Sequence, residues 1–423
     1  MAKSLIYLDH AATTPVDPRV FEAMRPFFAE SYGNPSSFHQ IGLQAKNAVA
    51  SARETVAKLL NAHADEIVFT SGGTESDNLA IFGVCRPRES GDPEMDSRFH
   101  GNDKKLHVVA SAIEHHAVLE PLKYLEKTGQ IELTVIPVDR AGLVDPKAVL
   151  SAIRPETVLV SIMTANNEIG TIEPIAEIGR AILTYRKSGA AGPGSAGENK
   201  TEYPYFHTDA CQAAGVLDLN VEKTHADLLT MNGSKIYGPK GVGVLFVRRN
   251  LKLEPMIFGG GQERNLRSGT ENVPGIVGLA KAFELVQAER ETENARLTVL
   301  RDRLIAGLLK LPKSHLNGHP VDRLPNNANV TFLDIEGEAA VLYLDAKGVM
   351  ASTGSACAST SLEPSHVILA TGLSYEAAHG SIRFTLGHDT TAKDIDYVLE
   401  IMPAIVERLK KMSPVNLDEK YFK

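Results

Sequence analysis

The sequence contains no tryptophan, only three cysteines, and neither a long apolar run nor a strongly basic block. The cysteines (Cys85, Cys211 and Cys357) form no CxxC pair and cannot build a disulfide framework, which favours a reducing compartment. No apolar run approaches the roughly 20 residues that cross a bilayer, and Asp9 and His10 come before any signal-like apolar core can form. The lack of a basic cluster argues against a nucleic-acid partner. We therefore expect a cytoplasmic protein of enzyme size that binds neither membrane nor nucleic acid.

The overall composition is ordinary for a globular protein. Of the 423 residues, 43% are hydrophobic and 23% are charged, with a formal net charge of −8. A chain of this length can form two domains.

Strand-like and helix-like stretches alternate between residues 36 and 290. Helical spacing of apolar residues follows Ser37, and further helices are predicted at 118–127 and 175–187. Several predicted strands are apolar on both faces, as buried parallel strands are. The alternation predicts an α/β domain with a mainly parallel sheet. The predicted strands are 66–70, 107–110, 132–138, 157–163, 205–208, 226–231 and 241–247.

A long helical stretch at 276–311 is expected to join this domain to a smaller α+β domain, with elements suggested at 329–333, 339–344 and 381–386. We assign residues 12–290 to the large domain and residues 1–11 plus 291–423 to the small one. Stretches 86–105 and 188–202 are charged or rich in Gly and Ser, so we expect surface insertions there.

The turn Ser71-Gly72-Gly73-Thr74 follows a predicted strand and begins a helix. Glycines allow close approach of a ligand, and free N–H groups at a helix start favour an anion. The arrangement suits a single phosphate, although a glycine turn with an ordinary threonine cap has the same pattern. It is not a P-loop, because GxxxxGK[ST] is absent.

Lys235 and Asp209 each follow a predicted strand, where α/β proteins bind ligands. The lysine amine can form a Schiff base with an aldehyde, and a carboxylate can keep a pyridine nitrogen protonated. Taken alone, a lysine at this position is usually a solvated strand end, and an isolated aspartate is more often a helix cap. Phosphate turn, aspartate and lysine in this order are the three fixed points of a pyridoxal-phosphate (PLP) site.

His115 and His116 are adjacent, so their side chains point apart, and no third ligand is spaced to complete a metal site. We expect no metal. Stacking of His115 on a flat cofactor ring and a packed structural histidine both remain open.

Cys357 lies within ten consecutive small residues, 352–361. Such a stretch cannot build a core, so we expect an exposed, pliable loop with an accessible thiol. Cys85 and Cys211 are interpreted as structural.

Taken together, these segments resemble the NifS/IscS-type cysteine desulfurases of the aminotransferase class V family, with the PLP fold type I architecture. The resemblance runs nearly end to end. It rests on YLDHAATTPVDPRV (7–20), GNPSS (33–37), VFTSGGTESDNLAI (68–81), EHHAV (114–118), SIMTANNEIG (161–170), HTDACQAAG (207–215), SKIYGPKGVG (234–243), RSGTEN (267–272) and SACASTSLEPS (355–365).

The resemblance implies a large α/β domain with a mainly parallel seven-stranded sheet, a smaller α+β domain and PLP as cofactor. It implies that Cys357, Lys235 and His115 are catalytic. It also implies a homodimer, in which Thr270 reaches the phosphate of the neighbouring subunit. The further implied roles are phosphate binding by Gly73, Thr74, Asn232, Gly233 and Ser234, ring binding by His115, Asp209, Asn167 and Gln212, and substrate binding by Arg383, Asn34 and Asn167.

The implied reaction converts L-cysteine to L-alanine and leaves the sulfur on Cys357 as a persulfide. The acceptor would be an iron–sulfur scaffold or an enzyme of tRNA or cofactor thiolation. The alternatives are a selenocysteine lyase, another class V aminotransferase, and an inactive PLP-binding scaffold. One departure from the family is Asn232-Gly233-Ser234 before Lys235, where Ser-Gly-His is usual.

Overall fold

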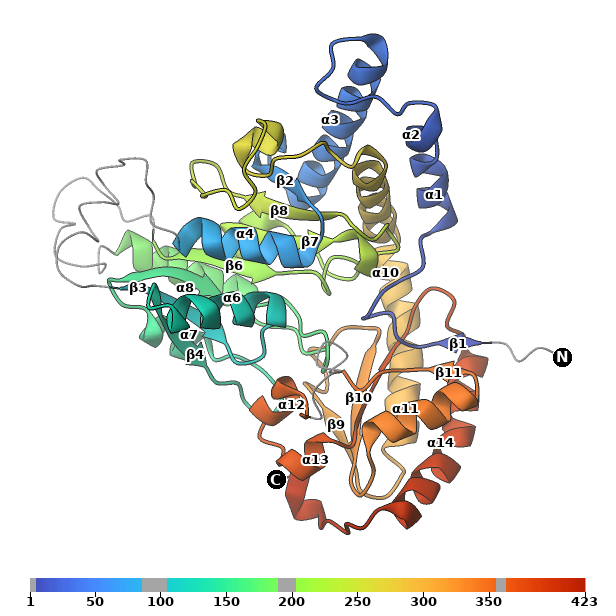
Figure 1. Cartoon of the computed structure of the whole chain (residues 1–423). Coiled ribbons are helices and arrows are strands. Elements are labelled where there is room, and N and C mark those ends of the chain that lie inside the picture. Colours follow the sequence, from blue (N-terminus) through green and yellow to red (C-terminus); the bar gives the residue numbers. More distant parts are fainter. Residues whose placement is uncertain (1–4, 86–104, 189–202, 355–362, 423) are drawn as a thin grey trace.

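The computed structural model describes residues 5–85, 105–188, 203–354 and 363–422. Its main sheet has seven strands in the order β2-β8-β7-β6-β5-β3-β4 (Figure 1). Only β8 runs antiparallel to its neighbours, so the predicted mainly parallel seven-stranded sheet is confirmed. The strands are β2 (Ile67–Thr70), β3 (Leu106–Ser111), β4 (Ile131–Ile136), β5 (Thr157–Ser161), β6 (Tyr205–Asp209), β7 (Leu228–Asn232) and β8 (Gly243–Val247).

Successive side chains of a strand point to opposite faces of the sheet, and both faces are covered. Ile67 and Phe69 pack with α3 (Gln40–Leu60) and the first half of α10 (Val273–Leu308), whereas Val68 packs with α4 (Gly73–Cys85) and α6 (His116–Lys127). Helices α7 (Pro146–Ala152) and α8 (Ile175–Lys187) cover the strands farther along the sheet. This two-sided burial explains why the strands lack the alternating polar pattern of a half-exposed sheet.

A second core surrounds a three-stranded antiparallel sheet, β12-β10-β9, and a parallel pair, β1-β11. Helices α11 (Gly337–Ala346) and α14 (Ala392–Met412) pack on it. The strands are β1 (Ile6–Tyr7), β9 (Ser314–Asn317), β10 (Asn327–Phe332), β11 (Val349–Met350) and β12 (Ser381–Thr385).

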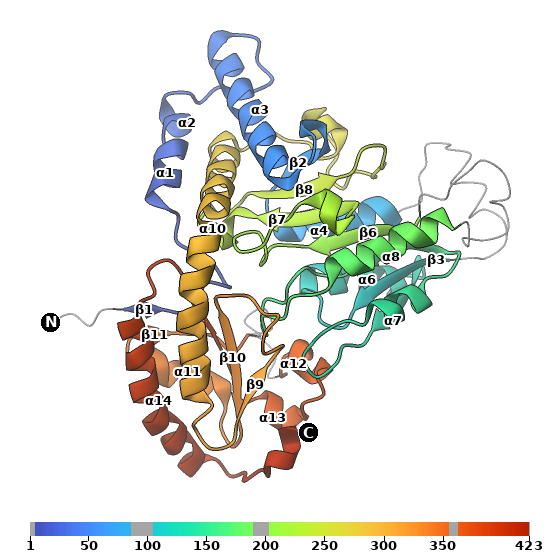
Figure 2. The same cartoon turned by 180° about the vertical axis from the view of Figure 1, so that it is seen from behind.

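Helix α10 joins the two cores, as the sequence predicted for a helix in this region (Figure 2). Its residues from Val273 to Val286 pack in the first core and those from Leu297 to Leu308 in the second. The exact division of the chain into two domains stays a prediction. The insertions at 86–105 and 188–202 lie almost entirely outside the described residues.

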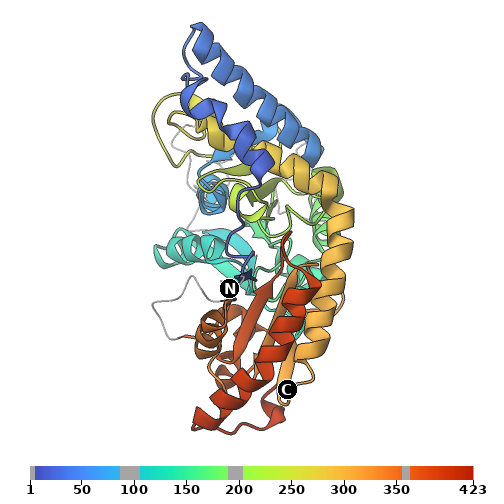
Figure 3. The ribbon, with the colours of Figure 1, turned by 90° about the vertical axis from the view of Figure 1, so that its right-hand side faces the viewer.

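The remaining helices are short. Helices α1 and α2 lie beside α3 at the end of the molecule opposite α14 (Figure 3). Within the described residues, no helix is both long and apolar enough to span a membrane. The short helices are α1 (Pro18–Met24), α2 (Pro26–Ala29), α9 (Val221–Thr224), α12 (His366–Ala370) and α13 (Tyr375–Ala378).

Candidate active site

A cavity of about 320 Å³ opens at the carboxyl ends of β5, β6 and β7, beside the first turn of α4. The main sheet supplies most of its wall, the N-terminal segment at Ala11 and Ala12 supplies another part, and Arg383 reaches in from β12. The cavity therefore combines segments that are far apart in the sequence. Ten of the predicted site residues line it: Gly73, Thr74, His115, Asn167, Asp209, Gln212, Asn232, Ser234, Lys235 and Arg383.

One end of the cavity is built for an anion. Helix α4 begins at Gly73 directly after the β2 turn, so its first N–H groups lack partners within the helix. A Cβ added at Gly73 would lie 2.7 Å from Cys211 Sγ and 3.1 Å from Asn232 Nδ2. Only glycine fits this close approach, which explains the glycine of the sequence motif. Thr74, Asn232 and Ser234 bring polar side chains to the same cavity.

The floor of the cavity holds two aspartates. Asp209 is 6% exposed and its Oδ1 accepts a hydrogen bond of 2.8 Å from Cys211 N. Asp77, on the second turn of α4, is 1% exposed, and burial followed by the charge of Asp209 raises its pKa well above the usual range. Burial therefore disfavours an ionised Asp77, and Asp209 is the more exposed of the two carboxyl groups.

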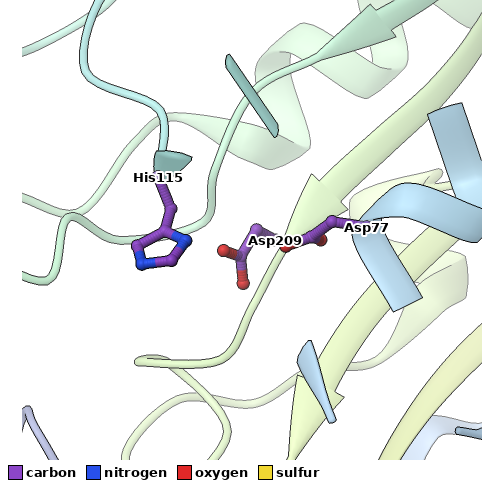
Figure 4. A group of neighbouring side chains, drawn as sticks. All are labelled: Asp77, His115 and Asp209. Carbon is purple, nitrogen blue, oxygen red and sulfur yellow. The ribbon is translucent and has the colours of Figure 1, made fainter. Parts of the chain in front are cut away.

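His115 faces Asp209 from the other side (Figure 4). Its Nδ1 accepts a hydrogen bond of 3.1 Å from Ala117 N, which caps α6 and requires Nδ1 to be unprotonated. Burial lowers the pKa of this imidazole, with a further contribution from Lys235. A neutral, oriented ring is the form that stacks on a flat cofactor.

The structure groups His115 with two carboxylates, Asp77 and Asp209, which the spacing of His115 and His116 did not suggest as metal ligands. One ligand atom from each of Asp77, His115 and Asp209 lies within 4.8 Å of the others. A metal ion there would require an ionised Asp77, which burial disfavours. The donor set and the anion cradle beside it fit the pyridine ring and phosphate of PLP better.

Lys235 follows β7 and directs its amine into the cavity. Its Nζ donates hydrogen bonds of 2.7 Å to Ala11 O and 2.5 Å to Ala12 O. Gln212 Nε2 donates to the same Ala11 oxygen at 2.9 Å. The N-terminal segment therefore holds the lysine and glutamine side chains on one side of the cavity.

Arg383 is 3% exposed and is held at both terminal nitrogens. Its Nη2 donates to Asp9 Oδ1 at 2.9 Å and its Nη1 donates to Asn167 O at 3.1 Å. Its Nε has no hydrogen-bond partner among the described residues although it is buried. A buried guanidinium with donor capacity to spare suits a carboxylate ligand.

Four predicted residues do not line this cavity. Asn34 is exposed, and its Oδ1 accepts from Ser36 N at 2.9 Å. Thr270 is also exposed, and Gly233 is buried beneath the cavity wall. Cys357 lies outside the described residues.

Sequence reasoning missed several cavity residues, of which Asp77 and Met163 are examples. Asp77 lies four residues after Gly73, and that spacing on a helix places both on one face. Met163, Ala11 and Ala12 carried no signal, since apolar residues read as core. The structural interpretation of Cys85 and Cys211 is confirmed because both are buried, and Cys211 also lines the cavity.

Comparison with known proteins gives one consistent result. The family model described as Aminotransferase class-V matches residues 6–398. "Cysteine desulfurase IscS" from Methanosarcina thermophila is 51% identical over 414 residues, which are 98% of this chain and 95% of that protein. The protein of the same name from Dictyoglomus turgidum is 48% identical over 413 residues and covers 97% of each chain.

Similar solved structures lead to the same family. A "NifS-like protein" superposes with a TM-score of 0.82 at 36% identity and covers 96% of this chain and all of its own. A structure described as "SspA in complex with cysteine" has a TM-score of 0.73 at 35% identity, and covers 90% of this chain and 98% of its own.

Proposed function

The chain belongs to the aminotransferase class V family, and on this premise we propose that it is a PLP-dependent cysteine desulfurase. It converts L-cysteine to L-alanine and transfers the sulfur to Cys357 as a persulfide. The observation that carries the proposal is the convergence of ten predicted site residues on one cavity, in a chain whose similarity to cysteine desulfurases spans nearly its whole length.

The cofactor's phosphate is held by the start of α4 at Gly73 and Thr74, with Asn232 and Ser234 alongside. Asp209 would hold the pyridine nitrogen, and His115, whose imidazole has a lowered pKa, would lie against the cofactor ring. Asn167 and Gln212 lie within the same cavity to bind the ring oxygen. Bound there, PLP supplies an electron sink for the bond that breaks at the substrate's Cα.

Lys235 would hold PLP through its aldehyde group and would be released when the substrate binds. The released amine then takes the proton from the substrate's Cα and acts as general base and acid. Carbonyl oxygens of Ala11 and Ala12 hold the ammonium form of Lys235 close to the cavity. Arg383 binds the substrate carboxylate and so fixes which face of Cα meets the lysine, with Asn34 as a further substrate contact.

Sulfur transfer requires the thiol of Cys357 to reach the substrate. Gly354, three residues before Cys357, lines the cavity. Three residues span at most about 11 Å when extended, which keeps the thiol within reach of the substrate. The thiolate attacks the substrate's sulfur, the Cβ–S bond breaks as the S–S bond forms, and the electron pair left on Cβ takes up a proton on the way to alanine.

A homodimer is part of the proposal. Exposed aromatic side chains gather on the segments around α1, α2 and α3, among them Phe28, with an exposed fraction of 61%, and Phe38, with 95%. Monomers rarely leave such side chains in water together. Thr270, exposed at the end of the RSGT motif, would complete the phosphate site of the partner subunit.

The sulfur acceptor is an iron–sulfur scaffold protein or an enzyme of tRNA or cofactor thiolation, and the cytoplasm is the compartment where such acceptors work. Selenocysteine cleavage, amino-group transfer and an inactive scaffold are the competing functions. An aminotransferase needs no protein thiol, and an inactive scaffold needs no lysine that reacts.

The test is incubation of PLP-loaded protein with L-cysteine, followed by quantification of alanine. We expect alanine from the wild type and none from Lys235→Ala, whereas Lys240→Ala, which removes an amine outside the cavity, should match the wild type. Equal alanine from Lys235→Ala would contradict the proposal, and a keto acid in place of alanine would indicate an aminotransferase.

A further inference from the structure

Glu168 is a buried carboxyl group beside the active-site cavity that the proposed chemistry does not use. The side chain follows Asn167, whose backbone oxygen binds Arg383. Glu168 is 5% exposed, and its backbone N–H donates to Asn166 Oδ1 at 2.8 Å.

The backbone of Glu168 is tied to the second core. Its carbonyl oxygen accepts hydrogen bonds from Asn327 Nδ2 at 3.2 Å and from Asn329 Nδ2 at 3.0 Å, both on β10. The backbone of Glu168 is therefore fixed relative to both sheets, and this restricts where its carboxyl group can lie.

That carboxyl group contacts both ends of the cysteine-bearing stretch. Oε2 accepts a hydrogen bond of 2.5 Å from Ser365 Oγ. A Cβ added at Gly354 would lie 2.9 Å from the same Oε2. Gly354 and Ser365 flank the stretch that contains Cys357, so one oxygen atom meets the chain shortly before and shortly after the cysteine.

Gly354 is linked to the strand of Arg383, and Ser365 is linked to helix α12. The N–H of Gly354 donates to Ser352 Oγ at 3.1 Å, and Ser352 pairs through its backbone with Arg383. Ser365 caps α12 by accepting from Val367 N at 3.1 Å and Ile368 N at 3.3 Å. Gly354 has a φ of +93°, a backbone conformation that residues other than glycine rarely adopt. The chain therefore needs a glycine to turn at this point.

Burial raises the pKa of Glu168, against the opposing effects of the Ser365 hydrogen bond, Arg383, His116 and His115. A purely structural contact at this place would require less free energy with a neutral side chain, because burying a carboxyl group is unfavourable. Glu168 directly follows the residue whose carbonyl holds Arg383, and its carboxyl group lies against both ends of the cysteine stretch. This placement indicates a role in setting the position of that stretch.

We propose that Glu168 is a positioning residue for sulfur transfer: it fixes the two ends of the cysteine-bearing stretch, at Gly354 and Ser365, relative to Arg383. The inference rests on the proposed function, since it concerns the approach of the Cys357 thiol to bound substrate. Catalytic geometry is sensitive to displacements of about 1 Å, which can cost on the order of 100-fold in rate.

The variants are Glu168→Ala, Glu168→Gln and Ser365→Ala, with Glu173→Ala as the matched control. Glu173 is also a buried glutamate, 4% exposed, but its carboxylate accepts from Val144 N and contacts neither end of the cysteine stretch. Glutamine at 168 keeps the acceptor oxygen for Ser365, so it should rescue the function that alanine loses.

The first measurement is amide hydrogen exchange in the cofactor-free protein, which does not depend on activity. We expect faster exchange at Gly354, Val367 and Ile368 in Glu168→Ala and Ser365→Ala, but not in Glu168→Gln or Glu173→Ala. Exchange at these amides that matches the wild type in Glu168→Ala would overturn the proposal. If Glu168→Ala does not fold, exchange at Gly354 in Ser365→Ala decides, because the Gly354 amide bonds to Ser352 Oγ and not to Ser365.

The second measurement is the single-turnover rate of persulfide formation on PLP-loaded protein. Glu168→Ala should lose about 10- to 100-fold in this rate, whereas the PLP absorbance change on adding cysteine and the KM for cysteine stay near wild-type values. A parallel loss of cysteine binding would contradict the positioning role. Wild-type protein that forms no persulfide would refute the proposed function, while the exchange result would still judge the contacts of Glu168.

Discussion

Asp77 and Asp209 lie in one cavity floor, yet their environments assign them different tasks. Burial and the charge of Asp209 raise the pKa of Asp77 well above its usual range, so ionisation of the Asp77 carboxyl is disfavoured. Two close carboxylates do not both ionise readily, and we assign contact with a pyridinium to Asp209, the more exposed of the two.

The two aspartates should therefore respond differently to the same substitution. Asp77→Asn keeps the shape of the side chain and removes a carboxyl group whose ionisation burial disfavours, and we expect alanine formation to fall less than about 10-fold. Asp209→Asn removes the charge that stabilises the pyridinium, and a loss of about 100-fold or more is expected. Steady-state kinetics of both variants decide the matter. Equal losses would mean that Asp77 also works as an anion.

Glu173 provides a test of buried charge away from the cavity. Burial raises its pKa from 4.5 to about 8. The unfolded chain releases this proton near pH 4.5 while the folded chain keeps it, so the folded state loses stability as the pH rises from about 4.5 to about 8. At 1.36 kcal/mol per pKa unit, the loss is at most about 5 kcal/mol.

Glu173→Gln cannot ionise and should escape this loss. The unfolding free energy of Glu173→Gln relative to the wild type is expected to increase between pH 5 and pH 8 and to level off above it. Chemical denaturation at several pH values measures the difference. A difference that stays constant across this range would contradict the raised pKa.

At the scale of elements, the junction of β2 and α4 determines whether the anion site is open. An added methyl group at Gly73 would lie 2.7 Å from Cys211 Sγ, closer than packing allows. Gly73→Ala should therefore displace Cys211 or Asn232 and weaken PLP binding by about 10-fold or more, measured by fluorescence titration of the cofactor-free protein. Ser71→Ala, on the exposed side of the same turn, is the control. Unchanged affinity in Gly73→Ala would argue against phosphate binding at this turn.

The elements themselves were largely predictable, because strands buried on both faces have a simple apolar pattern. The helix predicted at 175–187 matches α8 at both ends, and each of the seven predicted strands overlaps an observed one. The antiparallel direction of β8 was not predictable from its sequence, since GVLFV is equally apolar in either direction. Strand β9 was missed because SHLN is mostly polar and is fixed only by pairing with β10.

The site was predictable in part for a different reason. Motif residues such as Asp209 and Lys235 stand at strand ends, and the carboxyl ends of parallel strands meet at one edge of the sheet. Asp77 could have been found from its spacing of four residues after Gly73 on α4. Glu168 gave no such signal, because its position depends on contacts with the second core. Tertiary contacts of this kind cannot be read from spacing.

At the scale of the whole molecule, the exposed aromatic residues predict the assembly. Phe38→Asp places a charge at a 95%-exposed aromatic position and should shift the dimer to a monomer at micromolar concentration. Leu342→Asp is the control that should stay dimeric. Leu342 lies on α11, which packs on the second core, and its side chain is 71% exposed. Sedimentation velocity measures the outcome. A monomeric wild type, or a dimeric Phe38→Asp, would contradict the proposed interface.

The central claim is that the cavity delivers the substrate's sulfur to one particular thiol. The direct measurement is mass spectrometry of peptides from PLP-loaded protein after a single turnover with L-cysteine, with alanine counted in parallel. The account predicts one added sulfur atom on the peptide that contains Cys357, one alanine for each added sulfur, and neither adduct nor turnover in Cys357→Ala. Alanine production that continues in Cys357→Ala, or an adduct on Cys85 or Cys211 instead, would contradict it.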